Sequence, residues 1–317
     1  MRRATIVQVH LGKELPPYVA NQLRQSRILN PSENICLLID SAVDYEGATM
    51  RELGVTVVLV DRLAKSRNHA RFARWNQFRR NERGRFWRYA FERFFAIETF
   101  LEACPREDIV HLENDVMLYA RLESLLPKLR EGPGGIKLTM DSERRCIPGF
   151  VYIRDRSALA AMNEALLRRS LRKRHNDMEA LALYLREEGS EACSALPVVP
   201  EGYRKEHGLR DVAGREGTSP WYDEEFPRYG GVFDAAALGQ FLGGIDRIHQ
   251  DGDSRGFVNE TAVYDPRLFD LHWRKDDGLL FPYGRVKGLE FPLFNLHIHS
   301  KQLEEFSSER GASSTLP

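Results

Sequence analysis

Three short apolar runs near the N-terminus constrain the fold of this chain more than any other feature. They cover residues 5–10 (TIVQVH), 35–40 (ICLLID) and 54–60 (GVTVVLV). The second run is almost continuously apolar, which is typical of a parallel strand buried on both faces of a sheet. A helical stretch that opens at Pro16 and Pro17 separates the first two runs. This β-α-β-α-β rhythm predicts a doubly wound α/β sheet.

The remaining elements follow with less regularity. An arginine-rich segment over 67–85 precedes a helix over 86–103, whose aromatic and aliphatic residues fall on one face at helical spacing. We then expect a long loop over 201–232 and a polar tail from residue 307. Between these landmarks the sequence predicts strands over 109–112, 136–140, 150–153 and 294–299, and helices over 156–168, 176–187 and 234–242.

Composition narrows the setting but selects no partner. The 317 residues hold 46 basic and 46 acidic side chains, so the net charge gives no reason to expect nucleic acid or a membrane surface. The four cysteines show no C-x-x-C spacing, which favours a reducing compartment over a disulfide framework or a zinc site. No signal peptide and no apolar run of membrane length is seen. The expectation is a cytoplasmic protein without a membrane span.

Two carboxylates stand at the end of the strand expected over 109–112. Glu113 and Asp115 flank Asn114, and ligands of open α/β sheets sit beyond the carboxyl ends of the strands. Paired carboxylates there suit a hard divalent cation that also holds substrate phosphates, so magnesium or manganese is expected. The alternative is a solvated turn in which Asn114 and Asp115 are ordinary turn residues.

Three basic side chains alternate near the C-terminus. Strand geometry places His297, His299 and Lys301 on one face. Such an alignment is costly unless it meets anions or a metal. One histidine could complete a metal site with Glu113 and Asp115, and Lys301 could neutralise a diphosphate. An exposed strand face is the alternative.

Two arginines of the aromatic helix are further candidates. Arg88 and Arg93 lie off its apolar stripe and could reach a phosphate or a sugar. A solvated helix face explains them equally well.

Two acidic helix starts complete the set of candidates. Asn176 and Glu179 form a capping box that explains both residues, with Asp177 as a first-turn acid favoured by the helix dipole. Asp234 fits an ordinary N-cap. The small residues that follow it, including Gly239, allow close approach of another backbone or of a ligand.

In their order along the chain, these features resemble the GT-A fold of nucleotide-sugar-dependent glycosyltransferases. The resemblance rests on the N-terminal β-α-β half, the arginine-bearing aromatic helix, the D-x-D-like triplet at 113–115 and the histidine-lysine segment at 297–301, and it covers most of residues 4–301. It implies a GT-A type α/β fold with a doubly wound, mostly parallel central sheet flanked by helices and an irregular acceptor-side C-terminal half. It further implies a nucleotide-sugar-binding half over 1–125, an acceptor-binding and catalytic half of the same domain over 126–306, and a polar tail over 307–317.

The resemblance also assigns roles to the candidates. Asp115 matches the last acid of the triplet, which ligates the Mn²⁺ or Mg²⁺ that bridges the donor diphosphate. Glu113 matches the first acid, which faces the donor ribose or the metal, although the family more often has Asp there. His297 or His299, with Lys301, resembles the C-terminal element that ligates the metal and contacts the phosphates.

Further donor contacts follow from the same resemblance. Val9, His10 and Asp40, at the ends of the first two strands, match positions that meet the nucleotide base and ribose. Asn114, Arg88 and Arg93 are grouped with them as donor-binding residues. The helix start from Asp177 to Glu179 resembles the acidic helix that touches the donor sugar.

The activity implied is transfer of a sugar from a nucleoside-diphosphate sugar, UDP-sugar first, to a hydroxyl acceptor, expected to be a glycan. The metal and Lys301 would stabilise the charge that develops on the leaving diphosphate, while the sugar becomes oxocarbenium-like. An inverting enzyme needs a carboxylate base, for which Asp177 and Asp234 are the candidates, with Glu179 as a further acid. A retaining enzyme needs none.

Other functions stay open at this point. The arginine-rich segment over 67–93 carries aromatic residues, so the acceptor could be DNA with a hydroxymethylated base or an anionic glycan, although zero net charge does not favour nucleic acid. A nucleotidyltransferase also uses paired acids and magnesium, but no Gly-rich phosphate loop follows the first strand. A non-catalytic sugar- or nucleotide-binding module, and a non-haem iron oxygenase using His297, His299 and a carboxylate, remain.

Overall fold

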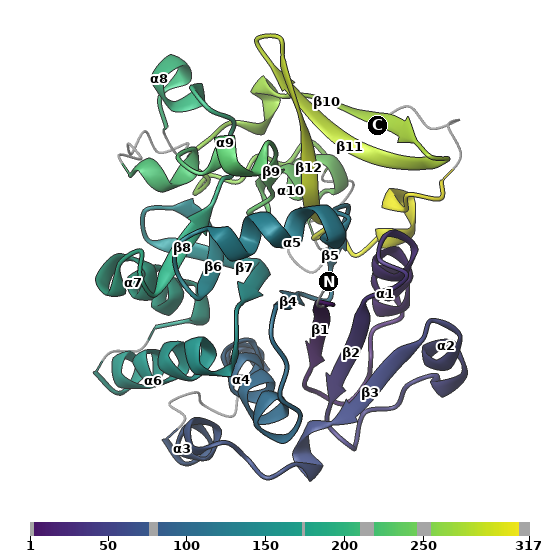
Figure 1. Cartoon of the computed structure of the whole chain (residues 1–317), viewed down its shortest axis with the longest axis vertical. Helices are drawn as coiled ribbons and strands as arrows, with labels where there is room; N and C mark the ends of the chain where they lie inside the picture. Colours follow the sequence, from purple (N-terminus) through teal and green to yellow (C-terminus); the bar gives the residue numbers. More distant parts are fainter. Residues whose placement is uncertain (1–2, 76–81, 173–174, 210–218, 246–254, 311–317) are drawn as a thin grey trace.

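A seven-stranded central sheet organises the protein (Figure 1). The computed structural model describes residues 3–75, 82–172, 175–209, 219–245 and 255–310. The strand order is β3-β2-β1-β4-β7-β6-β8, and four of the six neighbouring pairs are parallel. The strands are β1 (Thr5–His10), β2 (Asn34–Ile39), β3 (Val55–Leu59), β4 (Ile109–Leu112), β6 (Ile136–Ser142), β7 (Arg145–Ile153) and β8 (Cys193–Leu196).

Helices cover both faces of this sheet, as the doubly wound prediction requires. Side chains alternate along β1, so Val7 packs in one core and Ile6 in the other. The core around Val7 takes in α4 (Glu82–Ala103), α6 (Arg156–Arg172) and α7 (Asp177–Glu188). The core around Ile6 takes in α1 (Tyr18–Leu29) and α5 (Leu122–Glu131). Residue 125, the expected boundary between the two halves, lies within α5.

A second sheet occupies the C-terminal part of the chain, where a single strand over 294–299 was expected. Its order is β10-β11-β12-β5, all antiparallel, and β9 (Val232–Phe233) pairs with β12. Two-residue turns at 277–278 and 287–288 join its hairpins. Both residues of each turn have positive φ, with glycine second, which is a type I′ signature that the sequence displays. The strands are β5 (Val116–Leu118), β10 (Asp270–Asp276), β11 (Leu279–Val286) and β12 (Leu289–His297).

The described residues also contain helices that the sequence analysis missed. The arginine-rich segment forms α3 (Arg67–Trp75), which packs on α4 through Phe72 and Phe95, with ring centroids 4.7 Å apart. Arg79 and Arg80 lie outside the described residues. Further short helices are α2 (Gly47–Glu52), α8 (Tyr203–His207) and α9 (Phe226–Tyr229), whereas α10 (Ala237–Gly243) corresponds to the helix expected over 234–242. The expected loop over 201–232 is thus partly helical, and its residues 210–218 are not described, nor are residues 311–317 of the tail.

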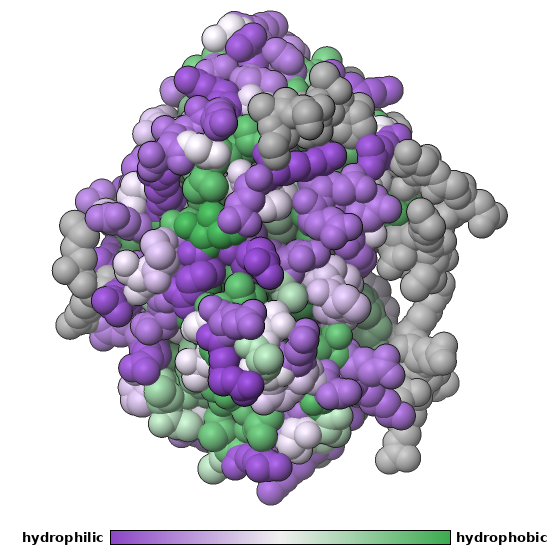
Figure 2. Space-filling model, turned by 90° about the vertical axis from the view of Figure 1, so that its right-hand side faces the viewer, coloured by the Kyte–Doolittle hydropathy of each residue, from purple (hydrophilic) through white to green (hydrophobic). Residues whose placement is uncertain are grey.

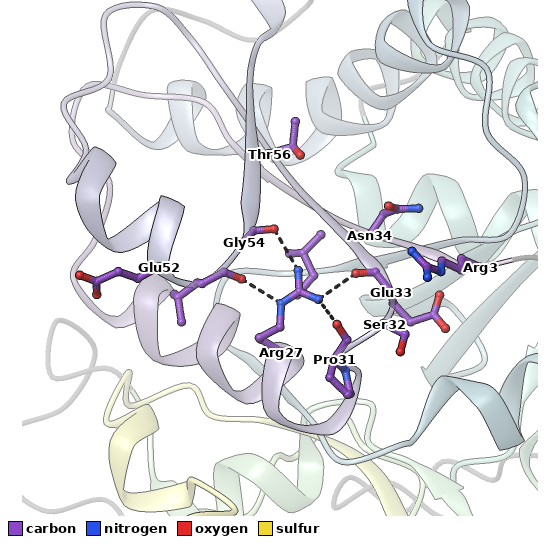
Figure 3. A pocket seen from close by; sticks show the side chains of 11 residues that line it. Arg3, Arg27, Pro31, Ser32, Glu33, Asn34, Glu52, Gly54 and Thr56 are labelled. Carbon is purple, nitrogen blue, oxygen red and sulfur yellow. Dashed lines mark hydrogen bonds between the residues drawn. The ribbon is translucent and has the colours of Figure 1, made fainter.

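One arginine ties together the loops at the amino ends of β2 and β3 (Figure 3). The Arg27 guanidinium, at the end of α1, donates to the carbonyl oxygens of Leu53 and Gly54 before β3, each at 2.9 Å. It also donates to the carbonyls of Pro31 and Glu33 before β2, again at 2.9 Å. Because these carbonyls occupy its donors, Arg27 fixes the rim of the sheet opposite the carboxyl ends of the strands.

The surface mixes polar and apolar residues. Figure 2 shows the side that carries α1, where hydrophilic residues surround smaller hydrophobic groups. Large hydrophobic side chains are exposed at only four of the described positions, namely Tyr45, Phe86, Leu268 and Leu289. Within the described part of the chain, no helix combines the length and the apolarity needed to cross a bilayer.

Candidate active site

The acidic triplet lies where the chain passes from the central sheet into the second sheet. β4 is a fully buried strand between β1 and β7, and it ends at Leu112. The Glu113 N–H donates to the Gly149 carbonyl of β7 at 3.0 Å, which continues the ladder by one residue. The Val116 N–H then donates back to the Glu113 carbonyl at 3.1 Å, forming a turn that starts β5. The triplet is therefore held between two sheets and is not a solvated turn.

The pairing of β5 with β12 brings the C-terminal histidine to the triplet. His297 is opposite Val116 in the antiparallel register, and the Ile298 N–H donates to the Asp115 carbonyl at 2.8 Å. The His297 Nε2 atom lies 3.1 Å from Asp115 Oδ1 and 3.7 Å from Glu113 Oε2. This juxtaposition confirms that the two sequence motifs meet.

Lys301 reaches the same carboxylate from beyond the end of β12. Its ammonium forms an ion pair with Asp115 Oδ2. Its backbone has a φ of 69°, and its N–H donates to the Ile298 carbonyl at 3.1 Å. The left-handed turn carries the side chain back over the triplet, and Nζ lies 5.9 Å from the centroid of the Tyr18 ring.

Two glycines allow His297 to sit this deep. A Cβ on Gly149 would lie 3.1 Å from His297 Nδ1 and from a methyl of Val116. A Cβ on Gly239 of α10 would lie only 2.1 Å from the His297 carbonyl oxygen, so α10 can approach β12 only through glycine. The close backbone approach expected from the small residues around Gly239 is therefore confirmed, and its partner is the backbone of His297.

Arg93 connects the triplet to the start of α7. Its guanidinium is buried and pairs with Glu113 Oε1 through one nitrogen and with Asp177 Oδ2 at 2.6 Å through another. Asp177 occupies the first position of α7, where Asn176 and Glu179 form the expected capping box. Arg93 therefore orients both acids, and its terminal nitrogens are engaged by protein carboxylates.

The neighbouring cations decide the charge of the buried acids. Burial raises the pKa of Asp115, but the charges of His297 and Lys301 outweigh this and hold that pKa well below its ordinary value. Burial also acts on Glu113, yet Arg93 keeps the pKa of Glu113 lowered. For Asp177 burial prevails, and its pKa is raised. When His297 is neutral, as a metal ligand must be, the three carboxylates are paired with Arg93 and Lys301, and the cluster then has an excess negative charge.

The two histidines of the C-terminal segment differ in character. Burial works to lower the pKa of His297, but Asp115 reverses the effect and the pKa is raised. No acid of the described ranges forms an ion pair with His299, and burial lowers its pKa to about 4. Its ring centroid is 5.6 Å from that of His297. His299 is therefore a neutral imidazole at physiological pH.

The donor set fits a divalent cation. One ligand atom from each of Glu113, Asp115 and His297 lies within 4.8 Å of the others, and this is the group of potential ligands found among the described residues. Two carboxylates and an imidazole suit Mn²⁺ or Mg²⁺, with positions left for substrate oxygens. The buried His297 Nδ1 and Asp177 Oδ1 atoms have no hydrogen-bond partner among the described residues, which is consistent with a site organised for a ligand.

The cluster opens into a cavity of about 620 Å³ at the carboxyl ends of β1 and β4. This volume lies within the range of small-molecule sites. Aromatic residues Tyr18, Trp87 and Tyr89 line one part, and the amide of Asn114 lies 3.2 Å from His10 Nδ1. Burial lowers the pKa of His10. The cavity thus combines an acidic cluster, aromatic rings and neutral hydrogen-bonding groups.

Most of the candidates from the sequence meet in this cavity. It is lined by Val9, His10, Arg93, Glu113, Asn114, Asp115, Asp177, His297, His299 and Lys301. Four candidates are not among its lining residues, and these are Asp40, Arg88, Glu179 and Asp234. Arg88 pairs with Glu92 one turn along α4 at 3.0 Å, and Glu179 is engaged in the capping box.

Asp234 has a structural position. Its two carboxylate oxygens accept the N–H groups of Leu238 at 2.9 Å, Gly239 at 2.8 Å and His297 at 2.9 Å. The residue is fully buried. These contacts fasten the first turn of α10 to β12. They indicate that Asp234 caps the helix and positions His297, and that it is not a base that receives a proton.

Several lining residues are not predicted by the sequence, because nothing in their sequence neighbourhood marks them. Arg145, Gln240 and Asn259 line the cavity from β7, α10 and the segment before β10. Tyr18 lines the cavity from the first position of α1, in the helical stretch that opens at Pro16 and Pro17. Trp87 belongs to the apolar face expected for the helix over 86–103, and it is half-buried and lines the cavity.

Comparisons with known proteins give partial likenesses. No protein-family model and no curated protein matches the sequence. Mouse xyloside xylosyltransferase 1 is similar in structure with a TM-score of 0.44 and 11% identity, over 65% of this chain and 90% of that one. The galactosyltransferase LgtC, in complex with donor and acceptor sugar analogs, is similar with a TM-score of 0.42 and 14% identity, over 69% of this chain and 81% of that one. A cytidylyltransferase from Leptospira borgpetersenii is similar with a TM-score of 0.37 and 13% identity, over 62% of this chain and 76% of that one.

Proposed function

We propose that this protein is a metal-dependent glycosyltransferase that takes a sugar from a nucleoside-diphosphate sugar. The observation that supports this most is the convergence of Glu113, Asp115, His297 and Lys301 at one cavity large enough for such a donor. Two acids and an imidazole suit the cation that diphosphates require, and an ammonium beside them suits the diphosphate itself. UDP is the proposed nucleotide, and a glycan or another hydroxyl compound is the proposed acceptor.

The residues divide the work of this reaction. Glu113, Asp115 and His297 would hold Mn²⁺ or Mg²⁺, which when bound supplies positive charge to the diphosphate oxygens. Lys301 adds a second positive charge beside Asp115. Arg93 is a positioning residue, because its ion pair with Glu113 Oε1 orients that carboxylate. In the reaction the bond from the anomeric carbon to the diphosphate oxygen breaks, the bonding electrons leave with the diphosphate, and the acceptor oxygen bonds to that carbon.

Asp177 is the acid we place beside the sugar. It lines the cavity, and its buried Oδ1 atom has no hydrogen-bond partner in the part of the chain that the structure describes. In an inverting reaction it would receive the proton of the acceptor hydroxyl, and its burial-raised pKa favours that task. Asp234 has both oxygens occupied by backbone N–H groups, so we do not assign it this role.

A donor panel tests the proposal. Purified protein with Mn²⁺ should hydrolyse or transfer from one nucleotide sugar of the panel. Asp115→Asn should lower that rate by roughly 10³-fold or more, because an amide is a poor ligand and carries no charge. Asp270→Asn makes the same change on exposed β10 and should leave the rate unchanged. No turnover of any donor, or full activity in Asp115→Asn, would reject the proposal.

A further inference from the structure

Five polar side chains form a connected network, and three of them, Arg145, Gln240 and Asn259, line the cavity. The Asn259 amide donates to Gln240 Oε1 at 3.0 Å. The Asn259 carbonyl oxygen accepts the Thr261 hydroxyl at 2.8 Å and lies 3.5 Å from an Arg145 nitrogen. Arg145 in turn pairs through Nε, at 2.7 Å, and Nη2 with the carboxylate of Asp141. All of these bonds orient groups that face the cavity.

Two hydrogen-bond donors of this network are left for a ligand. Since Asn259 fixes Gln240 Oε1 as an acceptor, the other end of the amide, Nε2, is a donor, and it has no partner among the described residues. Arg145 uses Nε and Nη2 on Asp141 and Asn259, and Nη1 has no partner among them either. Donors that line a cavity favour a ligand rich in acceptor oxygens, such as the hydroxyls of a sugar.

The charge of the network is already balanced within the protein. Asp141 is completely buried and directly paired with Arg145. The pair therefore offers a ligand hydrogen bonds without a net positive charge, and the amides of Gln240 and Asn259 are neutral. A carboxylate on the ligand would find no unpaired positive charge here, yet it would lose its hydrating water on binding, which costs free energy. The network consequently suits an uncharged, hydroxylated ring.

The position of Gln240 indicates which part of a nucleotide sugar this network would contact. Gln240 follows Gly239. The His297 backbone lies directly against the Gly239 Cα, so no side chain would fit there. Gln240 is thus one residue from the contact with the metal-ligand candidate His297. In a nucleotide sugar whose diphosphate sits at the Glu113, Asp115 and Lys301 cluster, the group immediately beyond the diphosphate is the sugar to be transferred.

We propose that Gln240 and Arg145, held by Asn259 and Asp141, bind the hydroxyl groups of the transferred sugar and select an uncharged sugar. This inference rests on the proposed function and adds its donor class. Gln240 contacts the sugar directly through Nε2, and Asn259 is a positioning residue that sets the direction of the Gln240 amide.

Binding measurements with two ligands test this without turnover. Calorimetry with Mn²⁺ gives the Kd of UDP and of the UDP-hexose that wild type prefers. Gln240→Glu keeps the acceptor for Asn259 but replaces the donor Nε2 by a carboxylate oxygen. Asn34→Asp is the matched control, because it makes the same change from amide to carboxylate at the exposed amino end of β2.

The expected result separates the sugar from the nucleotide. Gln240→Glu should raise the Kd of the UDP-hexose about tenfold, as expected for loss of one hydrogen bond to a bound ligand. The Kd of UDP should stay within about twofold of the wild-type value. Asn34→Asp should change neither Kd. A UDP-hexuronate should bind wild type at least about tenfold more weakly than the UDP-hexose.

Three outcomes would overturn the inference. Equal weakening of UDP and UDP-hexose would place Gln240 at the nucleotide, and no weakening of either would remove it from the donor site. Equal or tighter binding of the hexuronate would contradict selection of an uncharged sugar. Absence of UDP binding to wild type with Mn²⁺ would instead reject the proposed function itself, and this inference with it.

Discussion

At the scale of residues, the site depends on one guanidinium that holds two acids from distant segments. Arg93 joins Glu113, at the end of β4, to Asp177, at the start of α7. The sequence marks all three as candidates, since each lies at an element end or off an apolar stripe. It cannot show that Arg93 faces inward to these acids, because helical spacing gives only the direction of a side chain and not its partner.

The two acids of α7 are predicted to differ in function. Asp177→Asn should lower turnover by about 10²-fold or more, since the amide loses the charge of the proposed base while its oxygen can still accept from Arg93. Glu179→Gln should keep turnover within about twofold, because Gln also completes a capping box. Steady-state rates with the preferred donor check both variants. Equal losses would show that the helix start, and not the Asp177 charge, matters.

A buried lysine away from the site predicts a pH effect on stability. Lys137 is completely buried, where it donates to the Pro133 carbonyl and lies 3.2 Å from the Ser194 hydroxyl. Burial lowers its pKa from 10.5 to about 8. The unfolded chain therefore binds more protons than the folded protein between about pH 8 and pH 10.5, and the contribution of Lys137 to the free energy of unfolding rises with pH across this window.

Lys137→Met should remove this rise. The variant should be at least as stable as wild type at pH 7.5, because the Ser194 hydroxyl still donates to the Pro133 carbonyl at 2.9 Å. Between pH 8 and pH 10 wild type should gain roughly 1–3 kcal/mol relative to the variant. Urea unfolding at the two pH values measures the difference. A constant difference would mean that Lys137 keeps an ordinary pKa.

At the scale of elements, α10 and β12 form the least tolerant contact near the site. Gly239→Ala should be destabilising by about 2 kcal/mol or more, although alanine favours a helix, because its Cβ would fall 2.1 Å from the His297 carbonyl oxygen. Mn²⁺ binding should weaken as His297 shifts. Thermal unfolding and Mn²⁺ titration measure the two effects.

Gly243→Ala in the same helix is the control for that prediction. Its Cβ would meet the side chains of Ile298, Ser300 and Phe306 at 3.2 to 3.4 Å, and side chains can move by this amount. The loss of stability should therefore be smaller than for Gly239→Ala. If the two substitutions are equally tolerated, the close approach of α10 to β12 is not needed for the site.

The elements show where sequence reasoning succeeds. Strands β1 to β4 and helices α4, α6 and α7 were predicted because their patterns are long or fully apolar. The hairpins of β10, β11 and β12 were missed because their burial is partial and alternation is weak, although Asp277-Gly278 marks a two-residue turn. The lining residues Arg145, Gln240 and Asn259 could not be predicted, since only tertiary packing brings β7, α10 and the 259 segment together.

At the scale of the whole molecule, the proposed site is the joint between two sheets. The acidic triplet leaves the central sheet through β4 and enters the second sheet as β5, whose partner β12 carries His297. The residues of the proposed metal site come from strands almost two hundred residues apart, so the site forms only when both sheets pair. A bound cation should for this reason stabilise the folded protein as a whole.

Metal-dependent nucleotide binding tests the central claim most directly. Calorimetric titration of wild type with UDP should show binding in Mn²⁺ and none after metal removal with EDTA. His297→Ala should weaken UDP binding in Mn²⁺ by about 100-fold, as loss of a metal ligand predicts, whereas His272→Ala, at a half-buried position of β10 where it pairs with Glu290, should leave it unchanged. Equal UDP binding with and without metal, or unchanged binding in His297→Ala, would contradict the proposed metal-diphosphate site.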